Sequence, residues 1–309
     1  MLSYPSVRRH EKQFHHLSGL SVTEFDVLYR RFEPAWVKAE SARLHQRDRQ
    51  RQPGAGGDYR LELDTQLLLV MVWLRHYPTT ELLGYLFGVS QSTASRTMTR
   101  LLPVLAEVEE KEMQPPTGKR RSLAHFERDK PDLFAIFDAT EQSVNKPQDD
   151  KQARLYFSGK QRRPTCKTSL HVNQEGLIRQ ISPTTPGSLH DVTHLRQSGL
   201  LRGISPAVIA VADAAYVGLY KDLPNHSVLV PHKAARDHPL LPDQLLANRE
   251  LCAVRIKVEN VLAQLKRFRI LTHRFRHQVT TLHSQVFTIL AGLHNRRIQQ
   301  RLKQAWLAA

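Results

Sequence analysis

Three acidic residues stand where a divalent metal ion could be bound. Asp138 closes the apolar run LFAIFDAT (133–140), and Asp213 holds the same place in AVIAVADAAY (207–216). The third, Glu259, is the one acid of the basic segment RIKVENVLAQLKRFRIL (255–271). Magnesium prefers oxygen ligands and takes few protein carboxylates when phosphates supply the rest. Two such ions, about 3.5 to 4 Å apart, can activate an attacking oxygen and stabilise the leaving one.

Each acid also has a structural explanation. A carboxylate that follows a strand commonly forms a turn, and Glu259 lies four residues after Arg255, as in a helix-face ion pair. A metal site requires the elements to bring the three together. Alternation along the first strand places Asp138 on the face that carries Phe134 and Ile136. At 100° per residue, Glu259 lies on one flank of an apolar helical stripe, with Arg255 and Lys266 beside it. The stripe comprises Val258, Val261, Leu262, Leu265 and Phe268.

The formal net charge of +16 on 309 residues indicates a polyanionic partner. Six basic residues and no acid lie between Lys151 and Lys167, and seven lie between Arg255 and Arg276 with Glu259 as the only acid. Such stretches suit the sequence-independent binding of phosphate backbones. The alternative is a charge that serves solubility alone.

The element pattern changes near residue 122. Residues 1–50 and 61–112 have helical spacing, and RDRQRQPGAGGDYR (47–60) and MQPPTGKRRS (113–122) read as connections. Short β-rich runs follow at 133–140, 168–173, 177–182, 207–216 and 226–231, with helical patterns at 188–198, 243–271 and 278–306. Strands mixed with helices predict an α/β or α+β domain whose sheet is covered by helices.

The segment ELLGYLFGVSQSTASRTMTRLL (81–102) predicts a helix-turn-helix. Gly84 allows the two helices to cross, Gly88 to Ser90 form the turn, and Ser90 caps the second helix. Ala94, Met98 and Leu101 would face inward. Side chains left facing outward near the start of that helix can reach base edges or phosphates. These are Gln91, Ser92, Thr93, Ser95 and Arg96. A capped helical hairpin with no DNA partner is the alternative.

In combination, these motifs resemble the DDE-superfamily transposases of bacterial insertion sequences, on the branch related to Harbinger endonucleases. FDAT, GSLHD, VADAAYVG and the spacing Arg255, Glu259, Lys266 occur in the order of that family, over roughly residues 60–275. The resemblance implies an RNase H-like mixed sheet flanked by helices, preceded by an all-α helix-turn-helix region. The expected domains are 1–50 (helical), 60–115 (helix-turn-helix), 130–275 (catalytic) and 276–309 (a basic helical tail).

The resemblance also implies residue roles. Asp138, Asp213 and Glu259 would hold two Mg²⁺ ions, with Mn²⁺ as a substitute, for cleavage at the ends of the element and strand transfer into target DNA. Arg255 and Lys266 would contact DNA phosphates. His190 and Asp191 of GSLHD are further site candidates, although Ser188 and Asp191 also fit a capping box that opens a helix to Gln197. Synapsis of two ends implies a homodimer or higher oligomer on double-stranded DNA.

Other classes find less support in the sequence. The longest apolar run, LLLVMVWL (67–74), is too short for a membrane span, and no signal-peptide segment precedes it. We therefore expect a cytoplasmic, nucleoid-associated protein. Two distant cysteines support neither a disulfide framework nor a zinc site. Two functional alternatives stay open, namely a captured endonuclease that no longer transposes and a helix-turn-helix regulator with a structural sheet.

Overall fold

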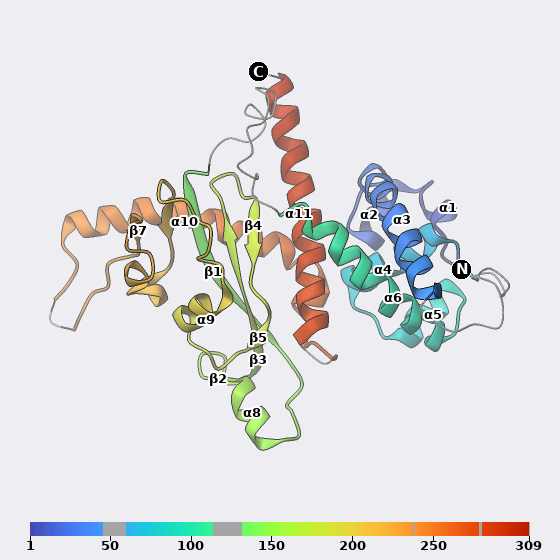
Figure 1. Ribbon diagram of the computed structural model, residues 1–309, viewed down its shortest axis with the longest axis horizontal. Coiled ribbons are helices and arrows are strands. Elements are labelled where there is room, and N and C mark those ends of the chain that lie inside the picture. The colour runs from blue at the N-terminus through green and yellow to red at the C-terminus, as the bar shows by residue number, and fades with distance from the viewer. Residues whose placement is uncertain (46–59, 114–131, 237, 278–279, 309) are drawn as a thin grey trace. The chain divides into compact units, whose positions relative to one another are not determined.

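A computed structural model describes residues 1–45, 60–113, 132–236, 238–277 and 280–308 of the chain (Figure 1). Their contacts form two compact units. One comprises Met1–Glu109 with Arg267–His273, and the other Glu110–Lys266 with Arg274–Ala309. The expected connection 47–60 falls almost wholly outside the described residues, as does most of 113–122.

The first unit is all-helical, as the sequence predicts. Its central helix is α4 (Leu63–His76), in which every residue from Thr65 to Leu74 is buried. That burial follows from the packing of α2, α3, α5 and η3 around α4. The elements of this unit are α1 (Tyr4–Val7), α2 (Glu11–Ser18), α3 (Val22–His45), α4, α5 (Thr80–Phe87), α6 (Gln91–Glu110) and the 3₁₀ turn η3 (Arg269–Leu271).

The second unit is built on a mixed sheet, which confirms the predicted fold class. β1 (Phe134–Ser143) lies between β3 (Arg163–Val172), which is antiparallel to it, and β6 (Ile209–Val211), which is parallel. β7 (Val228–Leu229) continues the sheet beyond β6. Three further strands pair with β3, namely β2 (Phe157–Ser158), β4 (Ile178–Ile181) and β5 (Thr185–Pro186).

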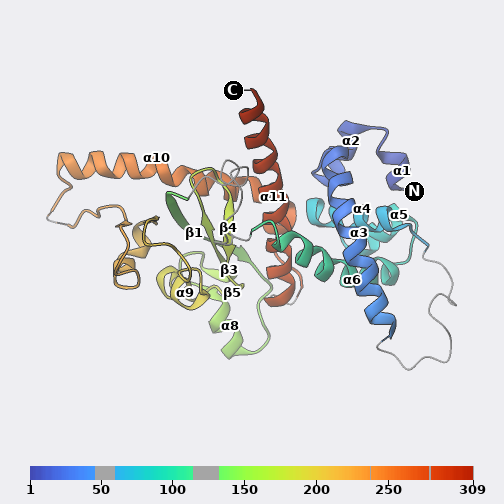
Figure 2. The same cartoon turned by 45° about the horizontal axis from the view of Figure 1, so that its top comes forward.

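Helices cover both faces of this sheet (Figure 2). On one face, α9 (Asp191–Ser198) contributes Leu195 to an apolar cluster with Phe137 of β1 and Tyr216. The other face receives α10 (Pro242–Leu265) and α11 (Thr280–Ala308), which contact β1, β3 and β4. A short helix not expected from the sequence, α8 (Asp150–Tyr156), joins β1 to β2.

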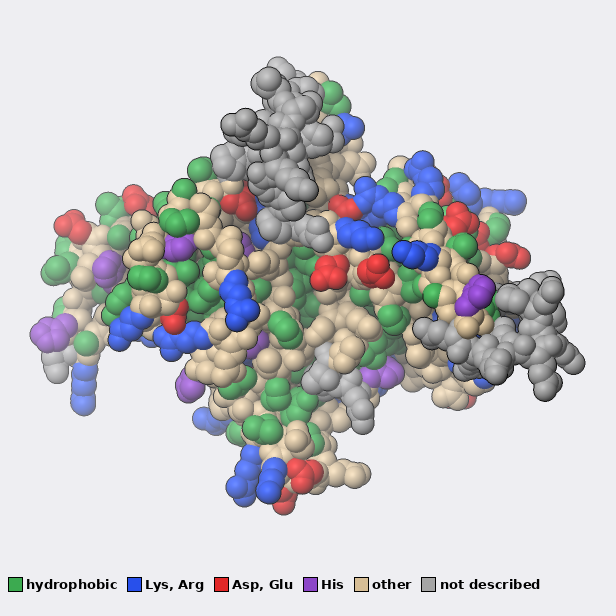
Figure 3. Space-filling model, in the orientation of Figure 1, with side chains coloured by type: hydrophobic (Ala, Val, Ile, Leu, Met, Phe, Trp, Pro, Cys, Tyr) green, Lys and Arg blue, Asp and Glu red, His purple; other side chains and the backbone are tan. Residues whose placement is uncertain are grey.

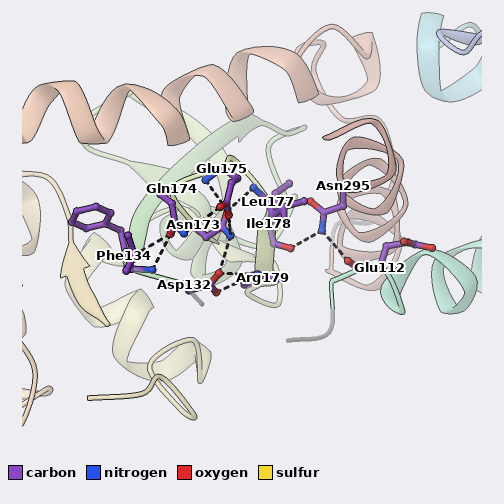
Figure 4. Close-up of polar contacts among 11 residues, drawn as sticks. Glu112, Asp132, Phe134, Asn173, Gln174, Glu175, Leu177, Ile178, Arg179 and Asn295 are labelled. Carbon is purple, nitrogen blue, oxygen red and sulfur yellow. Dashed lines mark hydrogen bonds and ion pairs between the residues drawn. The ribbon is translucent and has the colours of Figure 1, made fainter. Parts of the chain in front are cut away.

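Polar contacts fasten α11 to the sheet (Figure 4). The Asn295 side chain bonds the backbone N–H and C=O of Ile178 in β4, and donates to the carbonyl of Glu112. Nearby, Arg179 forms two hydrogen bonds to Asp132, just before β1. These bonds satisfy groups that would be costly to bury alone, so they fix the helix against β4.

Candidate active site and DNA-binding helix

Asp138 lies within β1, which continues to Ser143 and so does not end at this acid as its sequence suggests, and Asp213 lies just after the parallel neighbour β6. The register pairs Ile136 with Val211, the last residue of β6, and Asp138 and Asp213 each follow two residues later in their segments. The even spacing places Asp138 on the face of Ile136, which α10 covers. Each carboxylate also accepts a local backbone N–H, from Ala139 at 2.8 Å and from Ala215 at 2.6 Å. The turn-forming role suggested for Asp213 is therefore present as well, because Asp213 caps the turn that follows it.

Glu259 lies on α10 with its carboxylate paired to Arg255 at 3.6 Å. Its side chain is 56% exposed, whereas that of Arg255 is 15% exposed and leaves its Nε buried with no hydrogen-bond partner among the described residues. The expected ion pair is thus present. Val258, Val261, Leu262 and Leu265 form the buried stripe as predicted. Phe268 does not belong to it, because α10 ends at Leu265 and Phe268 packs in the helical unit.

The pKa of Asp138 depends on the charges of Asp213, Arg255 and Glu259. Burial raises the pKa of Asp138 to about 6, while the Ala139 amide opposes that rise. The charges of Asp213 and Glu259 raise this pKa further, and Arg255 lowers it. The second and third acids therefore lie within electrostatic range of Asp138. Among the described residues, however, no three Asp, Glu, His or Cys side chains are grouped closely enough to hold one metal ion.

The predicted helix-turn-helix is present as α5 and α6. A Cβ on Gly84 would lie 2.7 Å from the Val89 carbonyl, which confirms the close crossing. Gly88 has the left-handed φ of 68° that the turn requires, and the Ser90 hydroxyl accepts the Thr93 N–H at 3.2 Å. The buried face of α6 includes Ala94, Met98 and Leu101, as expected.

The side chains expected to reach DNA differ in whether hydrogen bonds to neighbouring residues hold them. Ser95 and Arg96 are exposed near the start of α6. Gln91 donates to Thr80 of α5 at 3.1 Å. Ser92 and Thr93 each share a hydrogen bond with the Ser90 hydroxyl. Ser95 and Arg96 are therefore the better placed to reach a groove.

The capping box predicted for GSLHD is wrong. α9 begins at Asp191, and its N-cap is His190, which makes no side-chain capping bond. Asp191 instead accepts a hydrogen bond from Lys167 at 2.6 Å. The carboxylate of Asp191 pairs with Lys167 because a buried ammonium group is costly unless it makes a strong charge-assisted hydrogen bond. Asp191 lies on the α9 side of the sheet, and His190 is exposed.

Two residues near the site, Lys167 and Tyr216, were missed from the sequence. Lys167 read as part of a basic, phosphate-facing stretch, yet it is 4% exposed and pairs with both Asp191 and Glu141. The hydroxyl of Tyr216 is buried beside Asp191 and Ser169 without a hydrogen bond of ordinary geometry to the described residues. Burial raises the pKa of Tyr216, and the charge of Asp191 adds to that rise. No local signal in the sequence marks Lys167 as buried, because every residue of β3 from Thr165 to Val172 is buried and burial does not alternate there.

Comparison with known proteins gives two family matches and one full-length relative. Residues 137–295 match a family described as DDE superfamily endonuclease. Residues 59–108 match the helix-turn-helix of DDE superfamily endonuclease. The chain is similar to the probable transposase for insertion sequence element IS702 of Microchaete diplosiphon, at 28% identity over 92% of this chain and 94% of that protein. No helix among the described residues is long and apolar enough to cross a membrane.

Proposed function

Because the chain belongs to the DDE superfamily of endonucleases, we propose that it is a transposase. It binds the terminal repeats of its own insertion sequence, cleaves them and transfers the freed strands into target DNA. The observation that carries this proposal is the proximity of three acids, namely Asp138 within β1, Asp213 two residues after the end of the neighbouring parallel strand β6, and Glu259 on α10, which contacts β1. The match of the helical unit to a helix-turn-helix family supports DNA binding.

The donor chemistry of the site suits a divalent cation. Asp138, Asp213 and Glu259 would supply hard oxygen ligands of the kind that Mg²⁺ and Mn²⁺ accept. When bound, two such ions would activate the attacking oxygen and stabilise the leaving one. The environment of Asp138 favours this, because burial and then the charges of Asp213 and Glu259 raise the pKa of its carboxyl group, and a bound cation would stabilise the ionised form.

In this proposal Glu259 joins the aspartates only when DNA arrives. Arg255 pairs with Glu259, and its buried Nε finds no acceptor in the part of the chain that the structure describes. A DNA phosphate supplies that acceptor and competes with Glu259 for the guanidinium group. The released carboxylate can then turn toward Asp138. Lys266, the C-cap residue of α10, would hold the backbone of the same strand.

A strand-transfer assay with the DNA that flanks the gene tests the proposal. With Mg²⁺ present, we expect nicks at the element ends and joined products in a second duplex. Nicks without joined products would identify an endonuclease that does not transpose, and binding without nicks would identify a regulator.

The roles of the acids have their own test. We expect Asp213→Asn to reduce cleavage by at least about 100-fold, because a lost ligand costs at least as much as a lost outer-shell partner. DNA binding, measured by mobility shift, should be unchanged. Asp243→Asn, which removes an exposed carboxylate from α10, is the matched control and should cleave normally. Equal cleavage by the two variants would reject the assignment.

A further inference from the structure

A small cavity opens where β1 continues past the end of β6. β6 ends at Val211, opposite Ile136 of β1, so among the described residues the next residues of β1 have no partner strand on that side. The cavity has a volume of about 180 Å³. It is lined by Ala139, Thr140, Glu141, Lys160, Gln161, Asp191 and Lys266. It therefore begins one residue beyond Asp138 and is distinct from the three acids.

The deeper wall of the cavity is a buried charge network. Lys167 donates to Asp191 and to the carbonyl of Leu189, each at 2.6 Å, and its ammonium lies 3.5 Å from Glu141. Glu141 also accepts the Thr165 hydroxyl at 2.9 Å. The side chains of Glu141 and Asp191 are only 10% and 20% exposed. Lys167 thus holds two carboxylates at fixed positions facing the cavity.

These carboxylates keep acceptor capacity for a ligand. An ionised carboxylate can accept about four hydrogen bonds. Among the described residues, Lys167 alone donates through its side chain to Asp191. A ligand that meets this wall must therefore present N–H or O–H donors.

The rim of the cavity carries the opposite charge. Lys160 and Gln161 lie in the turn between β2 and β3, and Lys266 is the C-cap of α10. All three are exposed. With Lys167, three lysines outnumber the two carboxylates, so the cavity as a whole attracts an anion. Its ligand is anionic at the mouth and rich in hydrogen-bond donors at the inner end.

We propose that this cavity receives one unpaired nucleotide of the DNA strand next to the reacting phosphate. Its phosphate would bind Lys160 and Lys266, and its base would donate an exocyclic amino group to Asp191 and Glu141. Adenine, cytosine and guanine carry such a group, whereas thymine does not. The base must leave the helix to reach a buried wall, as in other enzymes that extrude a base. This inference rests on the proposed function.

The test uses the full chain and duplexes from the element end in which 2-aminopurine replaces one base at a time around the cleaved phosphate. Fluorescence of this base rises when it unstacks. We expect a rise at one position adjacent to that phosphate when the protein binds, and loss of that rise in Lys160→Ala. Lys151→Ala is the matched control, because Lys151 is exposed on α8 and does not line the cavity. This variant should keep the rise. Figure 3 shows basic and acidic side chains together around α8, at the bottom of the view.

The possible results separate the two proposals. Cleavage without a fluorescence rise at any position, or an equal rise in Lys160→Ala and Lys151→Ala, overturns the nucleotide site and leaves the transposase intact. A chain that neither binds nor cleaves the duplexes overturns the proposed function and this inference with it. A second probe is thymine at the responsive position, which should weaken cleavage more in the unmodified chain than in Asp191→Asn. An equal effect in both would also reject the base contact.

Discussion

Burial of the ionised Asp138 carboxylate costs folding free energy that the neighbouring groups do not fully offset. Its pKa of about 6 lies above the ordinary value of 3.8 because the carboxyl group is buried near other acids. The folded chain therefore holds the proton more tightly than the unfolded chain. Stability should fall as the pH rises between these two values, by about 3 kcal/mol at most.

We expect Asp138→Asn to remove this dependence. Near pH 8 the variant should be more stable than the unmodified chain by up to about 3 kcal/mol, and near pH 4 the difference should vanish. Denaturant unfolding at both pH values measures it. Asp150→Asn, on the exposed start of α8, should leave the pH dependence of stability unchanged. A variant that is no more stable at the higher pH would show that burial does not strain Asp138.

At this scale the sequence reveals residues that follow clear apolar runs. Asp138 and Asp213 could be found because each closes such a run. Lys167 could not, because its partner Asp191 lies 24 residues away and is brought to it by the sheet. The Tyr216 hydroxyl was missed for the same reason, since its neighbours Asp191 and Ser169 belong to other elements.

The elements that the sequence predicts well are those with local signals. The helix-turn-helix has a capping serine, a turn glycine and a periodic apolar face within 22 residues, and each of these is found in α5 and α6. β2 and β5 have two residues each, too few to show a period. The first half of β3 is polar and basic, and becomes a strand because β1, β2 and β5 pair with it. Tertiary pairing outweighs propensity there.

We expect Gly84→Ala to damage the helix-turn-helix. Its new methyl group would stand 2.7 Å from the Val89 carbonyl, and relief requires α5 and α6 to separate. Overpacking of this kind costs about 1 to 3 kcal/mol. Thermal unfolding should show the loss, and affinity for the element end should fall because Ser95 and Arg96 move. Gly159→Ala has open space around the added atom and should change neither quantity.

Across the whole molecule, one short segment packs in a different unit from the residues before and after it in the chain. α10 belongs to the sheet unit up to Lys266, yet residues 267–273 pack in the helical unit before the chain returns at Arg274. Phe268 is 4% exposed; its ring lies 3.1 Å from the position of a Cβ on Gly19, and Arg75 lies over the ring at 5.5 Å. Arg75 also donates to the Arg267 carbonyl at 2.8 Å.

Phe268→Ala should therefore weaken a part of the molecule remote in sequence. Loss of a buried phenyl ring costs about 3 to 5 kcal/mol. Hydrogen exchange, read by peptide mass, should lose protection in α2 and α4 and keep it in β1 and β3. Leu302→Ala, at an exposed position of α11, is the control and should keep the exchange protection of the helices and of the strands. Faster exchange in β1 and β3 alone would contradict the packing of Phe268 in the helical unit.

The return of residues 267–273 to the helical unit limits how this protein could exchange parts with its relatives. A front half joined to a foreign catalytic half would lack Phe268, Ile270 and Leu271, all buried where they pack. Recombination at a single junction would then leave both products incomplete. A chimaera that keeps the helical unit intact therefore has to take residues 267–273 from the same parent as that unit, through one junction before Arg267 and another after His273.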